Sequence, residues 1–275
     1  LVELGLAADL KAAIVAHFFS DLRKDVEISR DYYNIRHNLP ILAQNIGNAK
    51  SPAFVAATAM LDGQLLAWDK ERGDVDDFML VAPDGRVVYS TADFRQQKAF
   101  AQLQYDTGRT AFVNGRSGVF VGDIFMPDDA NRDAESLAAN QADQNFYVTA
   151  PVKDERGNFA GEIAVLFDAR KLLTLAVDGT KGIWKTSEFA VSAHLPETVA
   201  DPRKHAVLFS SARSDAGLTA LHGAFLRSAE DLPSAKTYEG GEGFGRAVDY
   251  RGKDVLAAWR HISPMSLELA VKMDL

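Results

Sequence analysis

Residues 78–91 read FMLVAPDGRVVYST, in which two apolar runs flank the turn sequence Pro83-Asp84-Gly85-Arg86. Proline presets the backbone for a tight reversal, and glycine supplies conformations that other residues avoid. The β-branched and aromatic residues on both sides favour strands. The stretch therefore predicts a β-hairpin with strands at 78–82 and 87–91.

More strands are expected after this hairpin. Three further apolar runs, rich in β-branched and aromatic residues, lie at 118–126, 145–152 and 159–167. Short turns join antiparallel neighbours, so the five runs predict one antiparallel sheet. A helix is expected at 168–177, and the polar insert 127–144 is expected to be a long surface loop or a short helix.

The second half of the chain repeats this order of segments. A strand pair, a second pair joined by a short turn and a final strand are expected at 189–193, 205–211, 245–250, 255–260 and 267–274. The closing run LELAVKMD parallels the run EIAVLFD at 162–168. The repetition predicts a structural duplication, with two small antiparallel sheets built on one plan.

The N-terminal segment has a helical pattern. Apolar residues recur every three or four positions from Ile14 to Tyr33, and the first proline is Pro40. Two interpretations fit: one helix of about 35 residues and about 50 Å that forms a stalk and a dimer seam, or a bent helix or two helices packed on the core. Further helices are expected at 39–47 and 52–70, the second with Ser51 as its N-cap.

The composition excludes several classes of protein. Of the 275 residues, 47% are hydrophobic and 25% are charged, as in ordinary globular proteins. The net charge of −8 argues against a nucleic-acid partner, which a basic surface would attract. The chain has no cysteine, its histidines are scattered, and it contains no catalytic motif, so we expect no cofactor, no metal and no catalysis by this chain. No apolar run is long enough to span a membrane.

The order of the segments resembles the double Cache sensor domain. The resemblance is carried by the N-terminal helix to about Asn38, the hairpin 78–91, the strand pair 146–167 and the C-terminal strands within 248–274, and it covers essentially the whole chain. It implies an α+β fold in which a long N-terminal helix carries two PAS-like antiparallel β-sheet subdomains. The implied divisions are a stalk or dimer helix with the following helix at 1–50, a membrane-distal subdomain at 51–178 and a membrane-proximal subdomain at 179–275.

Members of this family are extracytoplasmic sensors of bacterial transmembrane receptors. The resemblance implies a periplasmic region of an inner-membrane protein, with membrane spans outside the 275 residues, a small-molecule site in the distal subdomain and a homodimer through the N-terminal helix. A two-component sensor histidine kinase is the favoured whole protein, and a methyl-accepting chemoreceptor or a diguanylate cyclase is the alternative. A free periplasmic binding protein fits less well, because its lobes would alternate strands with helices.

Strand alternation predicts part of the ligand site. Tyr147 and Thr149 share one face of their strand, and we expect Asp123 and Phe125 to join Tyr89 beside them on one concave surface. The same alternation places Phe120, a further candidate ligand-binding residue, on the other face of its strand. A buried Asp123 would need a ligand cation or a hydrogen-bond partner, and an ion pair with Arg116 or a loop cap is the alternative.

The family resemblance supplies the remaining candidates, which are Phe94, Arg95, Lys98 and Asp168. Relatives that bind amino acids grip the ligand carboxylate with an arginine followed closely by Trp-Tyr. Arg95 matches this arginine, but Lys98 and Ala99 replace Trp-Tyr, so small organic anions other than amino acids, such as carboxylates, stay open. Solvated surface charges are the alternative for Arg95 and Lys98, and a helix N-cap is the alternative for Asp168.

Overall fold

The computed structural model describes most of the chain in two compact units. The described residues are 2–92, 106–124, 145–177, 186–194, 206–211, 224–226, 233–237, 241–249, 251–265 and 267–275. As far as it is described, the first-sheet unit contains Ser20–Phe125 and Gln144–Ala169, and the second-sheet unit contains Leu1–Phe19, Met126–Asp143 and Arg170–Leu275. Helix α1 thus contributes residues to both units. The division of the chain at 50/51 and 178/179 into a stalk and two subdomains stays a prediction.

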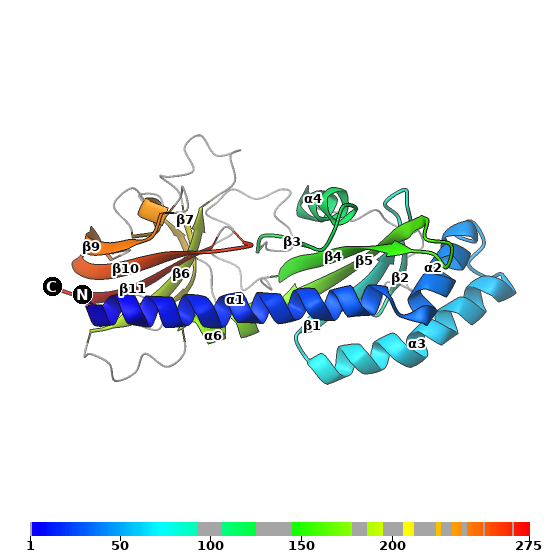
Figure 1. Cartoon of the computed structure of the whole chain (residues 1–275), viewed down its shortest axis with the longest axis horizontal. Coiled ribbons are helices and arrows are strands. Elements are labelled where there is room, and N and C mark those ends of the chain that lie inside the picture. The colour runs from blue at the N-terminus through cyan, green and yellow to red at the C-terminus, as the bar shows by residue number, and fades with distance from the viewer. Residues whose placement is uncertain are drawn as a thin grey trace. The chain divides into compact units, whose positions relative to one another are not determined.

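The N-terminal helical pattern corresponds to two helices, α1 (Val2–Arg30) and α2 (Tyr33–Gln44) (Figure 1). The backbone is extended at Tyr32, with φ −60° and ψ 133°, and this residue separates the helices. The interpretation of two helices is therefore confirmed, and a single helix of about 35 residues is wrong. Helix α1 has 29 residues and is about 43 Å long.

Helix α2 begins six residues before the expected start at Leu39, and it contains Pro40. A proline inside a helix removes one backbone hydrogen bond. Burial of Ile35, Leu39 and Leu42 on one side of α2 offsets this loss, because tertiary packing supplies most of the stability of a short helix.

Helix α3 (Pro52–Arg72) has the predicted N-terminal signal. The Ser51 hydroxyl oxygen accepts a hydrogen bond from the Phe54 backbone N–H at 3.2 Å, and Pro52 occupies the first turn. The helix ends at Gly73, whose φ of 65° is the left-handed conformation that favours glycine.

The first sheet contains the predicted five antiparallel strands in the order β2-β1-β5-β4-β3. The strands are β1 (Val75–Val81), β2 (Val87–Ser90), β3 (Phe120–Val121), β4 (Asn145–Lys153) and β5 (Phe159–Asp168). The hairpin prediction is confirmed, because Ala82 N–H donates to the Arg86 carbonyl at 2.8 Å and Gly85 has a φ of 87°. Strand β3 is far shorter than the expected 118–126, since the glycines on either side of it weaken a strand.

Helices cover both faces of the first sheet (Figure 1). On one face, Trp68 of α3 meets Phe78 of β1 edge to face, with ring centroids 5.3 Å apart. On the opposite face lies α4 (Asp106–Gly115), whose buried Ala111 packs against β1, β4 and β5. The sheet is therefore enclosed, and the α4 side is the one that the predicted ligand residues Tyr147 and Thr149 face.

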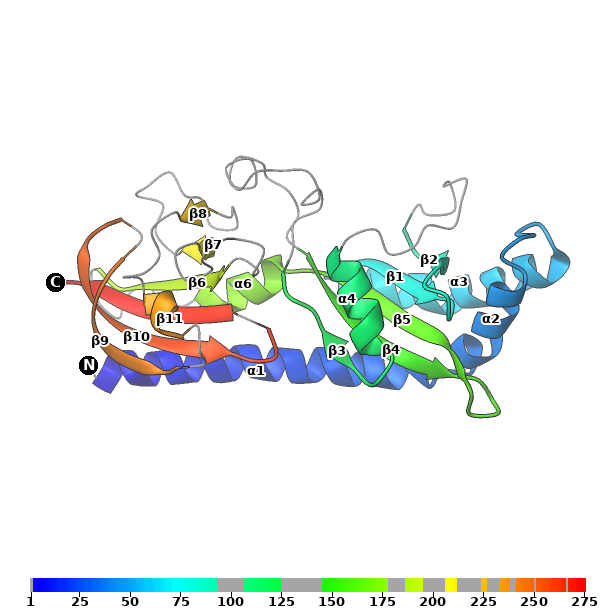
Figure 2. The same cartoon turned by 90° about the horizontal axis from the view of Figure 1, so that it is seen from above.

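The second sheet has the order β8-β7-β6-β11-β10-β9, and all of its neighbouring strands are antiparallel. Its strands are β6 (Glu188–His194), β7 (Ala206–Ser211), β8 (Ala224–Leu226), β9 (Gly243–Val248), β10 (Asp254–Ile262) and β11 (Leu267–Asp274). Figure 2 shows β9, β10 and β11 side by side. Strand β8 and the short helix η4 (Pro233–Thr237) were not predicted.

The predicted duplication appears in the strand orders. In the first sheet, the opening hairpin contributes β2 at the edge and β1 beside it. The closing strand β5 lies next to β1, and β4 and β3 follow. The second sheet follows the same path through β7, β6, β11, β10 and β9, with β8 added at the edge. In both sheets, the strand that closes the unit lies at the centre.

Two helical segments pack on one face of the second sheet. Lys11 of α1 donates to the Leu175 carbonyl of α6 (Arg170–Val177) at 2.9 Å and lies over the Phe189 ring of β6. Arg260 of β10 forms an ion pair with Asp9 of α1 at 2.6 Å. None of the helices in the described part of the chain combines the length and apolarity that a membrane span requires.

Candidate functional site

The strand register of the first sheet defines which side chains lie beneath α4. Thr149 of β4 and Met79 of β1 both pair with Ala164 of β5, and Phe120 of β3 pairs with Thr149. Paired residues point to the same side of a sheet. We call this side the α4 face; its described members are Asp77, Met79, Val81, Val87, Ser90, Phe120, Asn145, Tyr147, Thr149, Pro151, Glu162, Ala164, Leu166 and Asp168.

The middle of the α4 face is apolar. Met79, Val81, Tyr147 and Ala164 are buried there with Ala111 of α4, and Phe112 and Phe120 pack at the margin. Thr149 is fully buried among them, and its hydroxyl donates to the Ala111 carbonyl at 2.9 Å. This hydrogen bond attaches α4 to β4.

The last residue of α4 lies directly against two polar side chains. A β-carbon at Gly115 would be 2.6 Å from Oε2 of Glu162 and 2.8 Å from Cβ of Thr149, closer than real contacts allow. Only glycine therefore fits this approach without a shift of α4 or of the sheet.

Glu162 is a buried carboxyl group at one end of the α4 face. Its side chain is fully buried, and neither of its oxygens has a hydrogen-bond partner. Burial raises the pKa of Glu162 to about 8, and the Arg116 charge only partly opposes this. Arg116 itself donates to the Pro83 carbonyl and lies over the Phe112 and Phe159 rings.

Asp77 lies at the other end of the α4 face. Its carboxylate accepts hydrogen bonds from the Ser90 hydroxyl at 2.7 Å and from the backbone N–H groups of Thr91 and Ala92 at 3.1 and 3.2 Å. Burial raises the pKa of Asp77, although these hydrogen bonds favour the charged form. Asp77 thereby fixes the backbone where the chain leaves β2.

The structure brings together three of the predicted site residues, namely Phe120, Tyr147 and Thr149, on the α4 face. The alternation argument had placed Phe120 on the opposite side from Tyr147, and this part of the prediction is wrong. The reason is the register, which pairs Phe120 with Thr149 and not with a residue of the other face.

Tyr89 lies on the opposite face of the sheet. It pairs with Leu80, and its hydroxyl donates to Asp62 of α3 at 3.0 Å. The pairing of β1 with β2 shifts register between Leu80 and Val81, so alternation along β2 alone does not predict the face on which Tyr89 lies. The expectation that Tyr89 shares a surface with Tyr147 is therefore wrong.

The two predicted aspartates occupy different surroundings. Asp123 follows β3 and is exposed, so the expected cost of burying it does not arise. Asp168 is buried at the end of β5, opposite Asn145, and it lies two residues before the start of α6. Phe94, Arg95, Lys98 and Phe125 lie outside the described residues.

Sequence reasoning missed four polar members of the α4 face, which are Asp77, Ser90, Asn145 and Glu162. Asn145 is buried, and its side-chain oxygen Oδ1 has no hydrogen-bond partner. Alternation along β5 already placed Glu162 in line with Ala164 and Leu166, in a strand that is otherwise apolar on that side. That pattern was the available signal for a buried carboxyl group.

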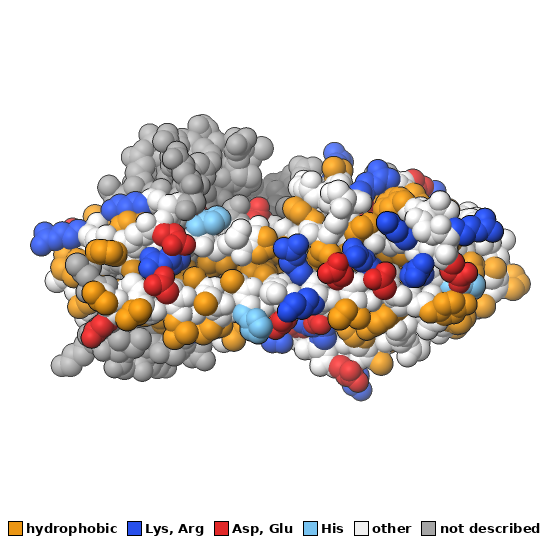
Figure 3. All heavy atoms as spheres, viewed as in Figure 1, with side chains coloured by type: hydrophobic (Ala, Val, Ile, Leu, Met, Phe, Trp, Pro, Cys, Tyr) orange, Lys and Arg blue, Asp and Glu red, His pale blue; other side chains and the backbone are white. Residues whose placement is uncertain are grey.

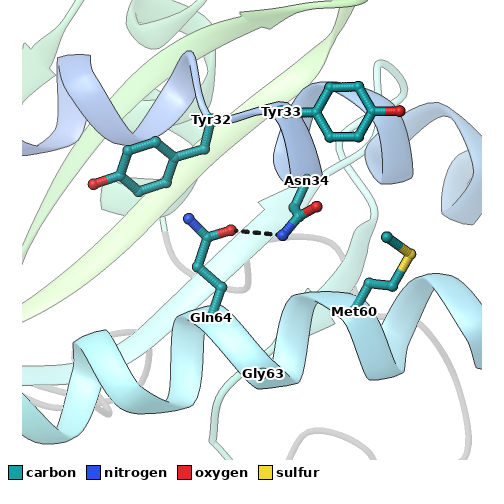
Figure 4. Close-up of a pocket in the computed structure, with 6 residues that line it drawn as sticks. All are labelled: Tyr32, Tyr33, Asn34, Met60, Gly63 and Gln64. Atoms are coloured by element: carbon teal, nitrogen blue, oxygen red, sulfur yellow. Dashed lines mark hydrogen bonds between the residues drawn. The ribbon is translucent and has the colours of Figure 1, made fainter.

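A cavity of about 400 Å³ lies elsewhere in the first-sheet unit, between α2 and α3 (Figure 4). It is lined by Tyr32, Tyr33, Asn34, Met60, Gly63 and Gln64. Asn34 donates to the Gln64 side-chain oxygen at 3.1 Å across it. The lining contains no charged group, and no residue predicted from the sequence contributes to it.

The face shown in Figure 3 and the acidic and histidine side chains of the described residues point neither to a nucleic-acid surface nor to a metal site. On the face shown in Figure 3, acidic and basic side chains are interspersed and do not form one basic patch. Within the described parts of the chain, no three His, Asp or Glu side chains are grouped so that they could hold a metal ion. The α4 face therefore stays the main candidate site.

Comparison with known proteins identifies the fold. No protein-family model and no curated protein sequence matches the chain. The extracellular domain assigned to the histidine kinase rpHK1S-Z16 superposes with a TM-score of 0.53 and 12% identity, covering 98% of this chain and 92% of its own. The ligand-binding domain of the Pseudomonas aeruginosa PAO1 amino acid chemoreceptor PctB, in complex with L-Arg, gives 0.54 and 15%, covering 99% and 94%.

The sensory domain of the Campylobacter jejuni chemoreceptor Tlp3 gives a TM-score of 0.60 and 9% identity, covering 99% of this chain and 92% of its own. This chain has the double Cache fold. Because each comparison spans nearly the whole chain, both sheets and the N-terminal helix belong to the shared double Cache architecture.

Proposed function

We propose that this chain is the extracytoplasmic ligand-sensing region of a bacterial transmembrane signalling protein. The observation that carries the proposal is the double Cache fold, which the chain shares over nearly its full length with extracellular domains of histidine kinases and chemoreceptors. The chain itself carries out no catalysis; its ligand would favour one arrangement of the first-sheet unit over another in proportion to its differential affinity for the two.

The ligand site is proposed to be the α4 face of the first sheet. Its centre is apolar, and the half-buried Asp77 and the buried Asn145 and Glu162 add a few oxygen atoms at its ends. Small-molecule sites commonly combine an apolar lining with a few placed polar groups. The unpartnered Oδ1 of Asn145 would accept a hydrogen bond from a ligand donor, and Arg95 and Lys98 would bind a ligand carboxylate.

The ligand experiment is a thermal-shift screen of the purified chain with small carboxylates, amines and L-amino acids, followed by calorimetry on each compound that raises the melting temperature. Amino acids are included because PctB was solved with L-Arg and Tlp3 with L-norvaline. We expect Asn145→Ala to weaken binding about tenfold, the effect of one lost hydrogen bond in a buried site. For a carboxylate ligand, Arg95→Ala should weaken it further.

The matched control for this experiment is Tyr33→Ala, which alters the cavity between α2 and α3 and leaves the α4 face unchanged. Wild-type affinity in Asn145→Ala and Arg95→Ala, together with lost binding in Tyr33→Ala, would place the ligand in that other cavity and refute the proposed site.

The favoured output is a two-component histidine kinase, because one of the matching folds belongs to such a domain. A chemoreceptor output is the second candidate, favoured by PctB and Tlp3. The coding sequence on either side of this chain distinguishes them: we expect apolar spans of about 20 residues on both flanks and then a kinase region. Flanks without such spans would contradict the transmembrane proposal.

A further inference from the structure

The carboxyl group of Glu162 lies at one end of the proposed ligand site, but no described group of the protein is its hydrogen-bond partner. It is fully buried, and both oxygens lack hydrogen-bond partners. Its neighbours across the sheet are Val81 and Pro151, which offer no side-chain donor. Buried polar groups in proteins are almost always hydrogen-bonded, so an unpartnered pair of carboxyl oxygens requires an explanation.

The charge state that fits this position is the neutral one. An ionised carboxylate without a partner is very costly to bury, whereas the protonated acid costs far less. Accordingly, burial raises the pKa of Glu162 to about 8, so the group binds a proton at neutral pH.

Helix α4 covers this group closely. Gly115 approaches Oε2 of Glu162 so nearly that a β-carbon there would be 2.6 Å away. The nearby Thr149 hydroxyl does not donate its proton to Glu162, because it donates to the Ala111 carbonyl of α4. An ionised Glu162 would need water at its oxygens, and water can reach them if the C-terminal end of α4 moves away from the sheet.

Few charges on the surrounding elements can compensate an ionised Glu162. After α4 comes Arg116, the group whose charge lowers the Glu162 pKa, but its hydrogen bond goes to the Pro83 carbonyl. On β4 the charged residue beyond Pro151 is Lys153, which is exposed, and on β1 the acid that shares the face is Asp77 at its far end. None of these forms a described ion pair with Glu162.

We propose that Glu162 is a proton-binding site that controls the docking of α4 on the first sheet: the protonated side chain permits docking, and loss of the proton releases the C-terminal end of α4. The proposal goes beyond ligand sensing, and its test requires no ligand. It makes the first-sheet unit sensitive to alkaline pH.

The direction of the pH effect follows from proton linkage. The ordinary pKa of glutamate is 4.5 and that of folded Glu162 is about 8, so the folded state binds this proton more tightly than the unfolded state does. The stabilisation is fully present below pH 4.5 and is lost as the pH rises to about 8. The docked state of α4 should weaken over the same upper range.

The experiment measures amide hydrogen exchange of residues 109–115 at about pH 6 and about pH 9, corrected for the intrinsic pH dependence of exchange. We expect wild-type protection to fall roughly a hundredfold at the higher pH, because docking weakens about tenfold for each pH unit from pH 6 up to the Glu162 pKa of about 8 and not further. Glu162→Gln keeps the size of the side chain without its charge, so its protection should stay constant. Glu71→Gln, which changes an exposed glutamate of α3, should behave like wild type.

A second measurement keeps the test independent of whether the variant folds. In the wild-type chain, the ¹³C shift of the Glu162 carboxyl carbon should titrate near pH 8. Titration near 4.5, or an equal loss of α4 protection in wild type and Glu162→Gln, would overturn the proposal.

Discussion

The closing strands of the two sheets carry the same pattern with different results. Strand β5 presents Glu162, Ala164, Leu166 and Asp168 at alternate positions, and β11 presents Glu268, Ala270, Lys272 and Asp274. Glu162 has Val81 and Pro151 as its cross-strand neighbours, whereas Glu268 has Ser192 and His261. One sequence position thus becomes an unpartnered acid in one sheet and a member of a polar row in the other.

The third residue of this alternating pattern is uncharged in β5, where it is Leu166, and charged in β11, where it is Lys272. Leu166 lies between Asp77 and Tyr147, but Lys272 pairs with Glu188 of β6 across the sheet, at 3.1 Å, and with Asp249 at 2.6 Å. Lys272, Glu188 and Asp249 are all buried. Although burial raises the pKa of Asp249, hydrogen bonds from Lys272 and Arg251 outweigh it and leave that pKa lowered, the opposite direction from Glu162.

The difference teaches that duplication of a backbone does not duplicate its electrostatics. In the second sheet, the buried charges of Lys272, Glu188 and Asp249 compensate one another. The first sheet holds a buried acid in its neutral form, which depends on pH. The proton-sensitive element is therefore expected in the first-sheet unit, and substitutions of Lys272 and Gly115 test this comparison, one for each sheet.

Lys272→Met is expected to have the largest effect. It leaves Glu188 and Asp249 buried without their shared cation, and breaking a buried ion pair on one side costs about 3–5 kcal/mol. Urea denaturation should show this loss of the free energy of unfolding, and adding Glu188→Gln should recover part of it.

The control for this substitution is Lys253→Met, an exposed lysine in the neighbouring turn, which should change stability by less than about 0.5 kcal/mol. Equal effects of the two lysine substitutions would show that the second sheet does not depend on charge compensation.

Gly115→Ala is expected to have an intermediate effect on the first sheet. The added methyl group would overlap Glu162 and Thr149, and overpacking of this kind costs about 1–3 kcal/mol. Gly63→Ala in α3 is the matched control, because a β-carbon there meets nothing within 4 Å. Thermal denaturation should show destabilisation by the first change and stabilisation by about 0.5–1 kcal/mol for the second. A stable Gly115→Ala would contradict the close docking of α4.

Substitution of Leu6 and Leu10 by serine should have the smallest effect on stability, within about 0.5 kcal/mol, because both side chains are 63% exposed. We propose that these residues of α1 contribute to a homodimer seam, so the same change should weaken self-association in sedimentation experiments. Unchanged self-association would remove the N-terminal part of α1 from the dimer surface.

Much of the fold could be predicted from local sequence signals. The hairpin at 78–91, the Ser51 cap and the repeated order of strands depend on residues that are near each other in the chain. The site was harder to predict. Phe120 and Tyr89 were placed on the wrong faces because their orientations depend on the partner residues Thr149 and Leu80.

The sequence by itself determined ten of the eleven described strands, their order and the duplication, because backbone preferences and hydrophobic periodicity act over a few residues. Only the tertiary structure decided that Glu162 meets Val81, Pro151 and Gly115 while Lys272 meets Glu188 and Asp249. These neighbours come from distant segments, and the cost of burying a charge depends on whichever groups the fold places around it.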